Sequence, residues 1–367
     1  MSENTDFRTD HIDKNFKLPT VIPKDDIVFY DVRRAPMRLY GLQPPVDGEG
    51  FCRVPRDVAA ATSEGVNILN TFTAGGRVRF STNSRYITIK VKMTATHPIY
   101  HMATTGSRGF DLYVDTPAGS YFRAVLCTDI SFGGGEYESW VELGETNGEM
   151  RDYTIHFPLY DNVEELYIGL QESATVGSGA AYAYDKPIVY YGSSITQGGC
   201  ASRAGLAYQS IISRQLNVDH INLGFSGNGK AEPAIVDYMA TLDPLIFVSD
   251  YDHNTPSLPH LDESHRRMYE KIRAAHPDVP YVMISRPDFF HMDSNARRKI
   301  IMDHFMEGIA KGDRNLYFID GESFFAAEYD KGDCTVDGCH PNDRGFALMA
   351  EHIGSTLRMI LKGQRYM

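Results

Sequence analysis

The sequence changes its pattern near residue 186, and this change constrains the fold more than any other feature. Between residues 25 and 172, β-branched and aromatic residues alternate with polar ones in short segments separated by Gly, Asn, Asp and Pro, which is typical of half-buried strands. After residue 186, short apolar runs alternate with segments whose apolar residues recur at helical spacing. The 367 residues are enough for two cores, so the change predicts two domains of different class.

The first part of the chain predicts an all-β domain. We expect its strands at 77–95, 110–116, 120–127, 152–160 and 165–172, with no long segment of helical spacing between them. Many short strands without helices are typical of a β-sandwich or jelly roll. We therefore expect an N-terminal extension over residues 1–24 and a sandwich (jelly-roll) domain over residues 25–172.

The second part predicts an α/β domain over residues 187–367, reached through a small polar join at 173–186. The apolar runs expected to be strands are 187–192, 220–225, 244–250, 280–285 and 315–320. The expected helices are 207–217, 231–242, 261–276, 294–311 and 343–361. This alternation indicates a parallel sheet with helices on both faces. In such sheets ligands bind beyond the carboxyl ends of the strands, so the residues after each run are the candidates for chemistry.

The composition narrows the partners and the compartment. A formal net charge of -12 disfavours nucleic acid, and no apolar run approaches the roughly 18 residues of a membrane span. The polar start of the chain has no apolar segment of a secretory signal. Five scattered cysteines suit a reducing compartment, although Cys334 and Cys339 are close enough in sequence to pair. We therefore expect a cytoplasmic protein.

Two segments carry the residue types of nucleophilic catalysis. Ser194 follows the first strand of the α/β domain and begins a helical turn, where the backbone N–H groups favour negative charge. A serine hydroxyl is a poor nucleophile until a base accepts its proton. His340, just before the last helix, is the candidate base, and Asp337 can hold its imidazole in the required tautomer.

The same strand ends offer groups for the rest of an acyl-transfer site. An oxyanion needs aimed hydrogen-bond donors, and the candidates are the N–H groups of Ser194 and Gly227 and the side chain of Asn254. Polar and aromatic residues of the crevice-facing segments suit a sugar. These candidate substrate contacts are Tyr251, Asp252, His253 and Arg286, with Asp288, Phe289 and Phe290 beside them.

Each of these residues also has a plainer interpretation. Ser194 can simply cap a helix, and His340 can be a surface histidine. Asp333 and Asp343 lie near Asp337 in sequence, and a Ser–His dyad can function alone.

The other candidates also have plainer roles. Gly227 and Asn254 are common turn residues. Arg286 can pair with an acid instead of lining the crevice.

A metal site is not expected at the pair Asp252 and His253. The pair lacks the third ligand and the spacing of a zinc site. Among the N-terminal strands, Asp111 is expected to be a buried, hydrogen-bonded residue of the β core rather than a substrate contact.

Four segments in one order resemble the blocks of the SGNH (GDSL-type) hydrolase family. They are GSSITQG at 192–198, GFSGNG at 224–229, HN at 253–254 and DGCH at 337–340. The segment GFDLY at 109–113 resembles the G-x-D-L-Y segment of the β domain that precedes the catalytic domain in one subgroup. The resemblance implies a flavodoxin-like SGNH sheet and the same catalytic roles for Ser194, His340 and Asp337.

The sequence departs from the family pattern at two places. Ser193 replaces the Asp that usually precedes the nucleophile, and the block around Asn254 lacks its usual G-x-N-D form. The first departure leaves catalysis intact, because that Asp has no catalytic role in the family. The second makes Asn254 the less secure assignment.

The resemblance implies an esterase. Similar two-domain proteins include bacterial acetylmannan and acetylxylan esterases, so we expect hydrolysis of acetylated oligosaccharides through an acyl-serine intermediate, without a cofactor. A lysophospholipase, thioesterase or aryl esterase of the same fold is an alternative. A non-catalytic carbohydrate-binding protein is another, disfavoured by the intact set of catalytic residues. The oligomeric state is not predicted.

Overall fold

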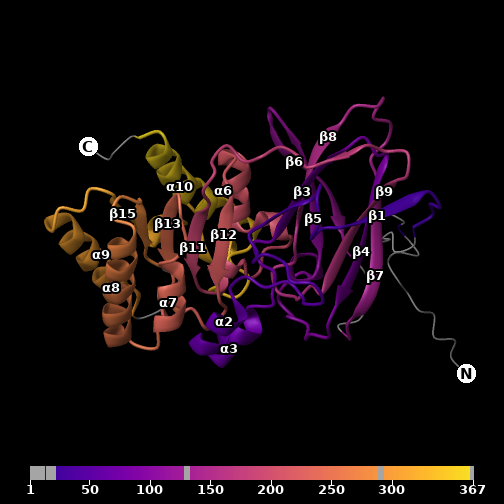
Figure 1. The fold of residues 1–367 in the computed structure, drawn as a ribbon. Coiled ribbons are helices and arrows are strands. Elements are labelled where there is room, and N and C mark those ends of the chain that lie inside the picture. Colours follow the sequence, from indigo (N-terminus) through magenta and orange to yellow (C-terminus); the bar gives the residue numbers. More distant parts are fainter. Residues whose placement is uncertain (1–12, 14–21, 128–132, 288–292, 364–367) are drawn as a thin grey trace, which may run out of the picture.

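The computed structural model describes residues 13, 22–127, 133–287 and 293–363. Figure 1 shows a β domain in indigo and magenta beside an α/β domain in orange and yellow. Within the described residues, no helix has both the length and the apolar character that a membrane span requires.

The β domain consists of two antiparallel sheets around one core. Their strands are β1 (Ile27–Asp31), β2 (Arg38–Tyr40), β3 (Arg77–Thr82), β4 (Tyr86–Met93), β5 (Phe110–Thr116), β6 (Gly119–Leu126), β7 (Gly135–Glu142), β8 (Arg151–His156), β9 (Glu165–Gln171) and β10 (Val176–Gly177). One sheet has the order β1-β9-β4-β7, and the other has the order β10-β3-β8-β5-β6 with β2 on β3. Ile87, Ile89 and Val91 alternate along β4 and pack with Phe80 and Ile155 of the facing sheet. This common core makes the domain a sandwich.

Several elements of this half differ from the sequence expectation. Strands β1, β2 and β7 were not expected, and β10 adds part of the join to a sheet by pairing Val176 with Thr82. Two helices, α2 (Arg56–Thr62) and α3 (Glu64–Leu69), interrupt the region that was expected to hold strands only. They pack on the α/β domain (Figure 1). Each buries one residue, too few to show a helical period in sequence.

The α/β domain has the predicted parallel sheet. Its strands are β11 (Ile188–Gly192), β12 (His220–Gly224), β13 (Ile246–Asp250), β14 (Tyr281–Ile284) and β15 (Leu316–Ile319). They lie in the order β12-β11-β13-β14-β15, the arrangement of flavodoxin-like folds. Its longer helices are α6 (Tyr208–Leu216), α7 (Pro233–Met239), α8 (Leu258–Ala275), α9 (Ser294–Ala310) and α10 (Asp343–Leu361). This confirms the predicted fold class.

Helices cover both faces of this sheet because side chains alternate along each strand. On β11, Tyr190 points to a core that includes Ile212 of α6 and Ile353 of α10. Its neighbour Val189 points to the opposite core, which includes residues of α7, α8 and α9. The strands are thus buried on both sides, which explains their continuous apolar sequences.

Buried polar contacts tie the two domains together. Arg53, 1% exposed, donates hydrogen bonds to the carbonyls of Leu69 and, across the interface, Gly224. Arg77 is fully buried and donates to Asp219 and to the carbonyl of His220. Buried cations are stable only when their donors are satisfied, so these contacts hold the domains in one relative position.

Asp111 makes a third contact of this kind. Its carboxylate is fully buried and accepts hydrogen bonds from the N–H of Gly205, at 3.0 Å, and from Nη1 of Arg203, at 3.2 Å. Burial raises its pKa to about 6 in spite of these two donors. Asp111 is thus a buried hydrogen-bonding residue, as expected, and it links β5 to the α/β domain.

Replacing Asp111 should weaken this link. In Asp111→Ala, the N–H groups of Gly205 and Arg203 lose their acceptor, and an unsatisfied buried group costs about 1–3 kcal/mol. We expect urea titration to show a fall of that size in the free energy of unfolding. Glu136→Ala is the control, because Glu136 is exposed and its ion pair with Lys90 is a surface contact; it should change stability by less than about 0.5 kcal/mol. Equal stability of the two variants would contradict the structural role of Asp111.

Candidate active site

Glycines at two strand ends allow a short helix to sit directly on the sheet. Gly192 ends β11 and pairs in parallel register with Gly224 of β12 and Asp250 of β13. A Cβ at Gly192 would collide with Oγ1 of Thr196, and one at Gly224 would collide with the N–H of Gln197. Both clashes involve α5 (Ser194–Gln197), so the two glycines permit this turn to rest on the strand ends.

Ser194 is the first residue of α5 and is 7% exposed. The hydroxyl of Ser193 accepts a hydrogen bond from the N–H of Ile195 at 3.2 Å and so caps the helix. Ser193, which replaces the Asp of the family pattern, thus has a structural role. The carbonyl of Ser194 accepts the N–H of Gly199 at 2.8 Å and the hydroxyl of Tyr160 at 3.1 Å. Tyr160 belongs to the β domain, so both domains hold this turn.

The structure brings Ser194, His340 and Asp337 into one hydrogen-bonded chain. Nε2 of His340 lies 2.9 Å from Oγ of Ser194, and Nδ1 of His340 lies 2.7 Å from Oδ2 of Asp337. These distances suit proton transfer from a serine to an imidazole that is oriented by a carboxylate. We call these three residues the triad.

A tight loop presents Asp337 and His340. An antiparallel bridge joins Thr335 to Pro341, and Gly338 turns the chain with a positive φ of 81°. Oδ1 of Asp337 accepts the N–H groups of Cys339, at 3.0 Å, and of His340, at 2.7 Å. The loop therefore fixes both side chains of the D-x-x-H segment relative to each other.

The hydrogen bonds keep Asp337 ionised. Burial alone would raise the pKa of its carboxyl, but the N–H and imidazole of His340 and the N–H of Cys339 outweigh burial and lower the pKa to about 2. The alternative Asp343 is engaged elsewhere, because its carboxylate accepts the N–H and hydroxyl of Ser202. Of these two acids, only Asp337 is hydrogen-bonded to the imidazole of His340.

The three candidate oxyanion donors lie after three neighbouring strands. The N–H of Ser194 begins α5 and has no acceptor within that helix. Gly227 has a φ of 67° and faces open space. Oδ1 of Asn254 accepts the N–H of Gly229 at 3.3 Å, which leaves its Nδ2 as a donor. Their role toward a substrate stays a prediction.

Two of the expected substrate contacts are in the protein interior. Tyr251 is 1% exposed, and its hydroxyl lies 2.8 Å from Oγ of Ser264. Asp252 is fully buried and accepts the N–H of Arg286 at 3.3 Å. With at most 1% of their surface exposed, Tyr251 and Asp252 present no side-chain surface to a substrate, which corrects the expectation for both.

The remaining expected contacts have different positions. The guanidinium of Arg286 is nearly buried and donates to Asp293 at 2.6 Å and to Ser294, so it pairs with an acid. His253 is half-buried beside Asn254 in a short 3₁₀ turn, Asp252–Asn254. Asp288, Phe289 and Phe290 lie outside the described residues.

A loop of the β domain reaches the triad. Ile99 and Met102 pack in a core of the α/β domain. Between them, Nε2 of His101 lies 3.6 Å from Oδ2 of Asp337, and Tyr100 is 95% exposed. No motif marks this segment, because its position depends on how the domains pack.

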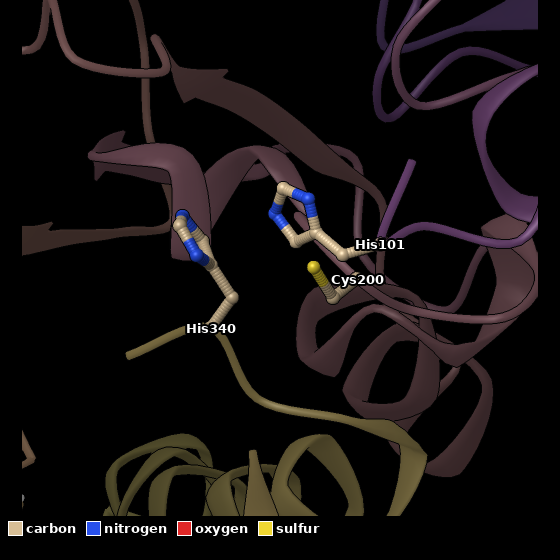
Figure 2. A group of neighbouring side chains, drawn as sticks. All are labelled: His101, Cys200 and His340. Carbon is tan, nitrogen blue, oxygen red and sulfur yellow. The ribbon is translucent and has the colours of Figure 1, made fainter. Parts of the chain in front are cut away.

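One group of side chains could hold a metal. The ligand atoms of His101, Cys200 and His340 all lie within 4.8 Å of one another (Figure 2). Among the described residues, the pair Asp252 and His253 belongs to no such group. Cys334 and Cys339 are both free thiols, so they do not form a disulfide here.

A separate cavity lies at another part of the domain junction. It has a volume of about 430 Å³ and is lined by residues of both domains, including Arg79, His156 and Arg214. No triad residue lines it. The cavity is therefore distinct from the site around the triad.

Comparison with known proteins identifies both halves of the chain. Residues 185–358 match the GDSL-like lipase/acylhydrolase family, and residues 27–176 match the GxDLY domain, the N-terminus of SGNH-hydrolase-type esterases. No curated protein matches the chain.

Solved structures share the two-domain fold. A protein from Bacteroides ovatus, described as a GDSL-like lipase, is 29% identical with a TM-score of 0.81, over 92% of this chain and 98% of that one. A salicylyl-acyltransferase from a tetracycline biosynthetic pathway is 17% identical with a TM-score of 0.75, over 93% and 98%. The acetyl xylan esterase Est2A from Butyrivibrio proteoclasticus is 11% identical with a TM-score of 0.59, over 92% and 99%.

The two family matches follow each other along most of the chain, and the triad lies at the strand ends of the second. Residues 185–358 therefore form a domain of the GDSL-like lipase/acylhydrolase family, preceded by a GxDLY domain over residues 27–176, and the chain is a carboxylic ester hydrolase.

Proposed function

We propose that the protein hydrolyses esters through an acyl-serine intermediate on Ser194. The observation that carries this proposal is the hydrogen-bonded chain from Ser194 through His340 to Asp337. Nε2 of His340 accepts the hydroxyl proton while Oγ of Ser194 attacks the carbonyl carbon. The ionised carboxylate of Asp337 stabilises the resulting imidazolium.

The same groups complete the acylation of Ser194 and then its hydrolysis. The imidazolium of His340 gives its proton to the departing alcohol and leaves the acyl group on Ser194. His340 then accepts a proton from water while the water oxygen attacks the acyl carbon, and it returns that proton to Oγ of Ser194 as the carboxylic acid leaves. The N–H groups of Ser194 and Gly227 and the amide of Asn254 would hold the oxyanion of each intermediate.

The substrate we propose is an O-acetylated oligosaccharide. Space beside the triad is limited, because a Cβ at Gly199 would lie 2.8 Å from the hydroxyl of Tyr160 and 3.2 Å from Cδ2 of His340. A short acyl group suits such a closely packed site. The exposed ring of Tyr100, next to His101, offers a flat surface of the kind that sugar rings stack on. Carbohydrate esterases among the proteins of this fold support the proposal.

Substitutions in the triad should follow the roles of the residues. Ser194→Ala and His340→Ala should each lower kcat by at least about a thousandfold, because one removes the nucleophile and the other the base. Asp337→Ala should cost less, since the acid only orients and stabilises. Ester hydrolysis by the purified variants measures this order, and Ser355→Ala, an exposed serine on α10, is the control with unchanged activity. A Ser194→Ala variant with more than about a hundredth of the wild-type kcat would refute the assignment.

The acyl group and the alcohol can be tested separately. We expect kcat/KM to fall steeply from acetyl to butyryl to octanoyl p-nitrophenyl esters, because each methylene in a pocket changes discrimination by about 1–3 kcal/mol. We also expect acetate release from acetylated manno- or xylo-oligosaccharides. A rise toward the octanoyl ester without acetate release from any oligosaccharide would favour a lipase or thioesterase.

Tyr100 gives this measurement a matched pair of variants. Tyr100→Ala should raise KM for an acetylated oligosaccharide and leave KM for p-nitrophenyl acetate unchanged, since only the sugar reaches the ring. Tyr121→Ala is the control, because Tyr121 is also exposed but lies on β6, outside the loop that reaches the triad. Equal effects of the two substitutions on the oligosaccharide would argue against a sugar contact at Tyr100.

A further inference from the structure

Three metal-binding side chains converge beside the triad from separate segments. His101 comes from the β-domain loop between β4 and the short helix α4 (Thr104–Ser107), Cys200 follows α5, and His340 comes from the loop before α10. Figure 2 shows the two imidazole rings and the thiol gathered at the domain boundary. One ligand atom from each lies within 4.8 Å of the other two.

We propose that His101, Cys200 and His340 form an inhibitory binding site for a divalent transition metal, with Zn²⁺ the best fit. Two imidazoles and a thiol are the ligands that Zn²⁺ prefers. Mg²⁺ and Ca²⁺ prefer oxygen ligands, so this set selects against them. Three protein ligands leave a fourth position for water or for the carboxylate of Asp337, which lies 3.6 Å from Nε2 of His101.

The geometry requires only a small adjustment. Tetrahedral zinc with bonds of about 2.0–2.3 Å holds its ligand atoms about 3.3–3.8 Å apart. The three ligand atoms of this group lie within 4.8 Å of one another, so they must move closer together to bind the ion. Cys200 is held by its surroundings, since it is 7% exposed and its φ is 75°. The side chain of His101 is 48% exposed, so its rotation can close the difference.

Metal binding must displace a proton from Cys200. Burial, with the nearby groups Asp337 and Cys339, raises the pKa of the Cys200 thiol to about 12. The thiol is thus protonated in the metal-free protein, and coordination replaces the S–H bond by a metal–sulfur bond and releases one proton to water.

Occupation of the site should stop ester hydrolysis. His340 uses Nδ1 toward Asp337 and Nε2 toward Ser194. A neutral imidazole has one lone pair, so a metal on either nitrogen leaves none to accept the proton of Ser194. Metal binding itself is independent of the esterase proposal, whereas the inhibition rests on it.

The binding experiment uses the full chain and ZnCl₂ in isothermal titration calorimetry. We expect one Zn²⁺ per chain in the wild type and in Ser194→Ala, which keeps all three ligands. His101→Ala and Cys200→Ser should each weaken Zn²⁺ binding by at least about tenfold. Even the loss of a residue that only hydrogen-bonds to a metal ligand typically lowers metal affinity by that factor. His97→Ala and Cys52→Ser are controls, since both residues lie outside the group. Equal affinity in all variants would overturn the site.

The activity experiment follows p-nitrophenyl acetate hydrolysis with Zn²⁺ or Mg²⁺. Zn²⁺ should inhibit the wild type, EDTA should restore its activity, and Mg²⁺ should have no effect. His101→Ala and Cys200→Ser, each compared with its own zinc-free rate, should need at least about tenfold more Zn²⁺ for the same inhibition. Full activity with Zn²⁺ bound would overturn the inhibitory role. A chain inactive on every ester would refute the proposed function, and calorimetry would still decide the metal site.

Discussion

Gly192 and Gly224 end neighbouring parallel strands, and the first turn of α5 rests directly on both. Any side chain at either position would push this turn away from the sheet. The turn carries Ser194, and the parallel register places the segments after β12 and β13 beside it. The position of Ser194 relative to Gly227 and Asn254 therefore depends on the close contact between two glycines and one helical turn.

The β domain completes this arrangement. Tyr160 donates to the carbonyl of Ser194, and the loop with His101 reaches Asp337. These contacts require a fixed domain position, which the buried groups Arg77 and Asp111 supply. The candidate active site is therefore a property of both domains, although all three triad residues lie in one.

Much of the fold and the proximity of the three triad residues could be predicted, because both follow from short sequence patterns. Continuous apolar strands predicted the parallel sheet, and residues at strand ends predicted Ser194. Two features could not be predicted from short sequence patterns. The position of His101 depends on packing between domains, and the short helices α2 and α3 bury too few residues to show a period. Tyr251 and Asp252 were misassigned because a place after a strand does not determine where a side chain points; both turn into the core.

The central claim is that Ser194 carries the acyl group during hydrolysis. It is tested most directly by mixing the protein with p-nitrophenyl acetate, quenching in acid and locating any acetyl group by peptide mass spectrometry. The account predicts one acetyl group on the peptide that contains Ser194, and none in Ser194→Ala. Steady release of acetate by the wild type with no acetyl group on Ser194 at any quench time would contradict it.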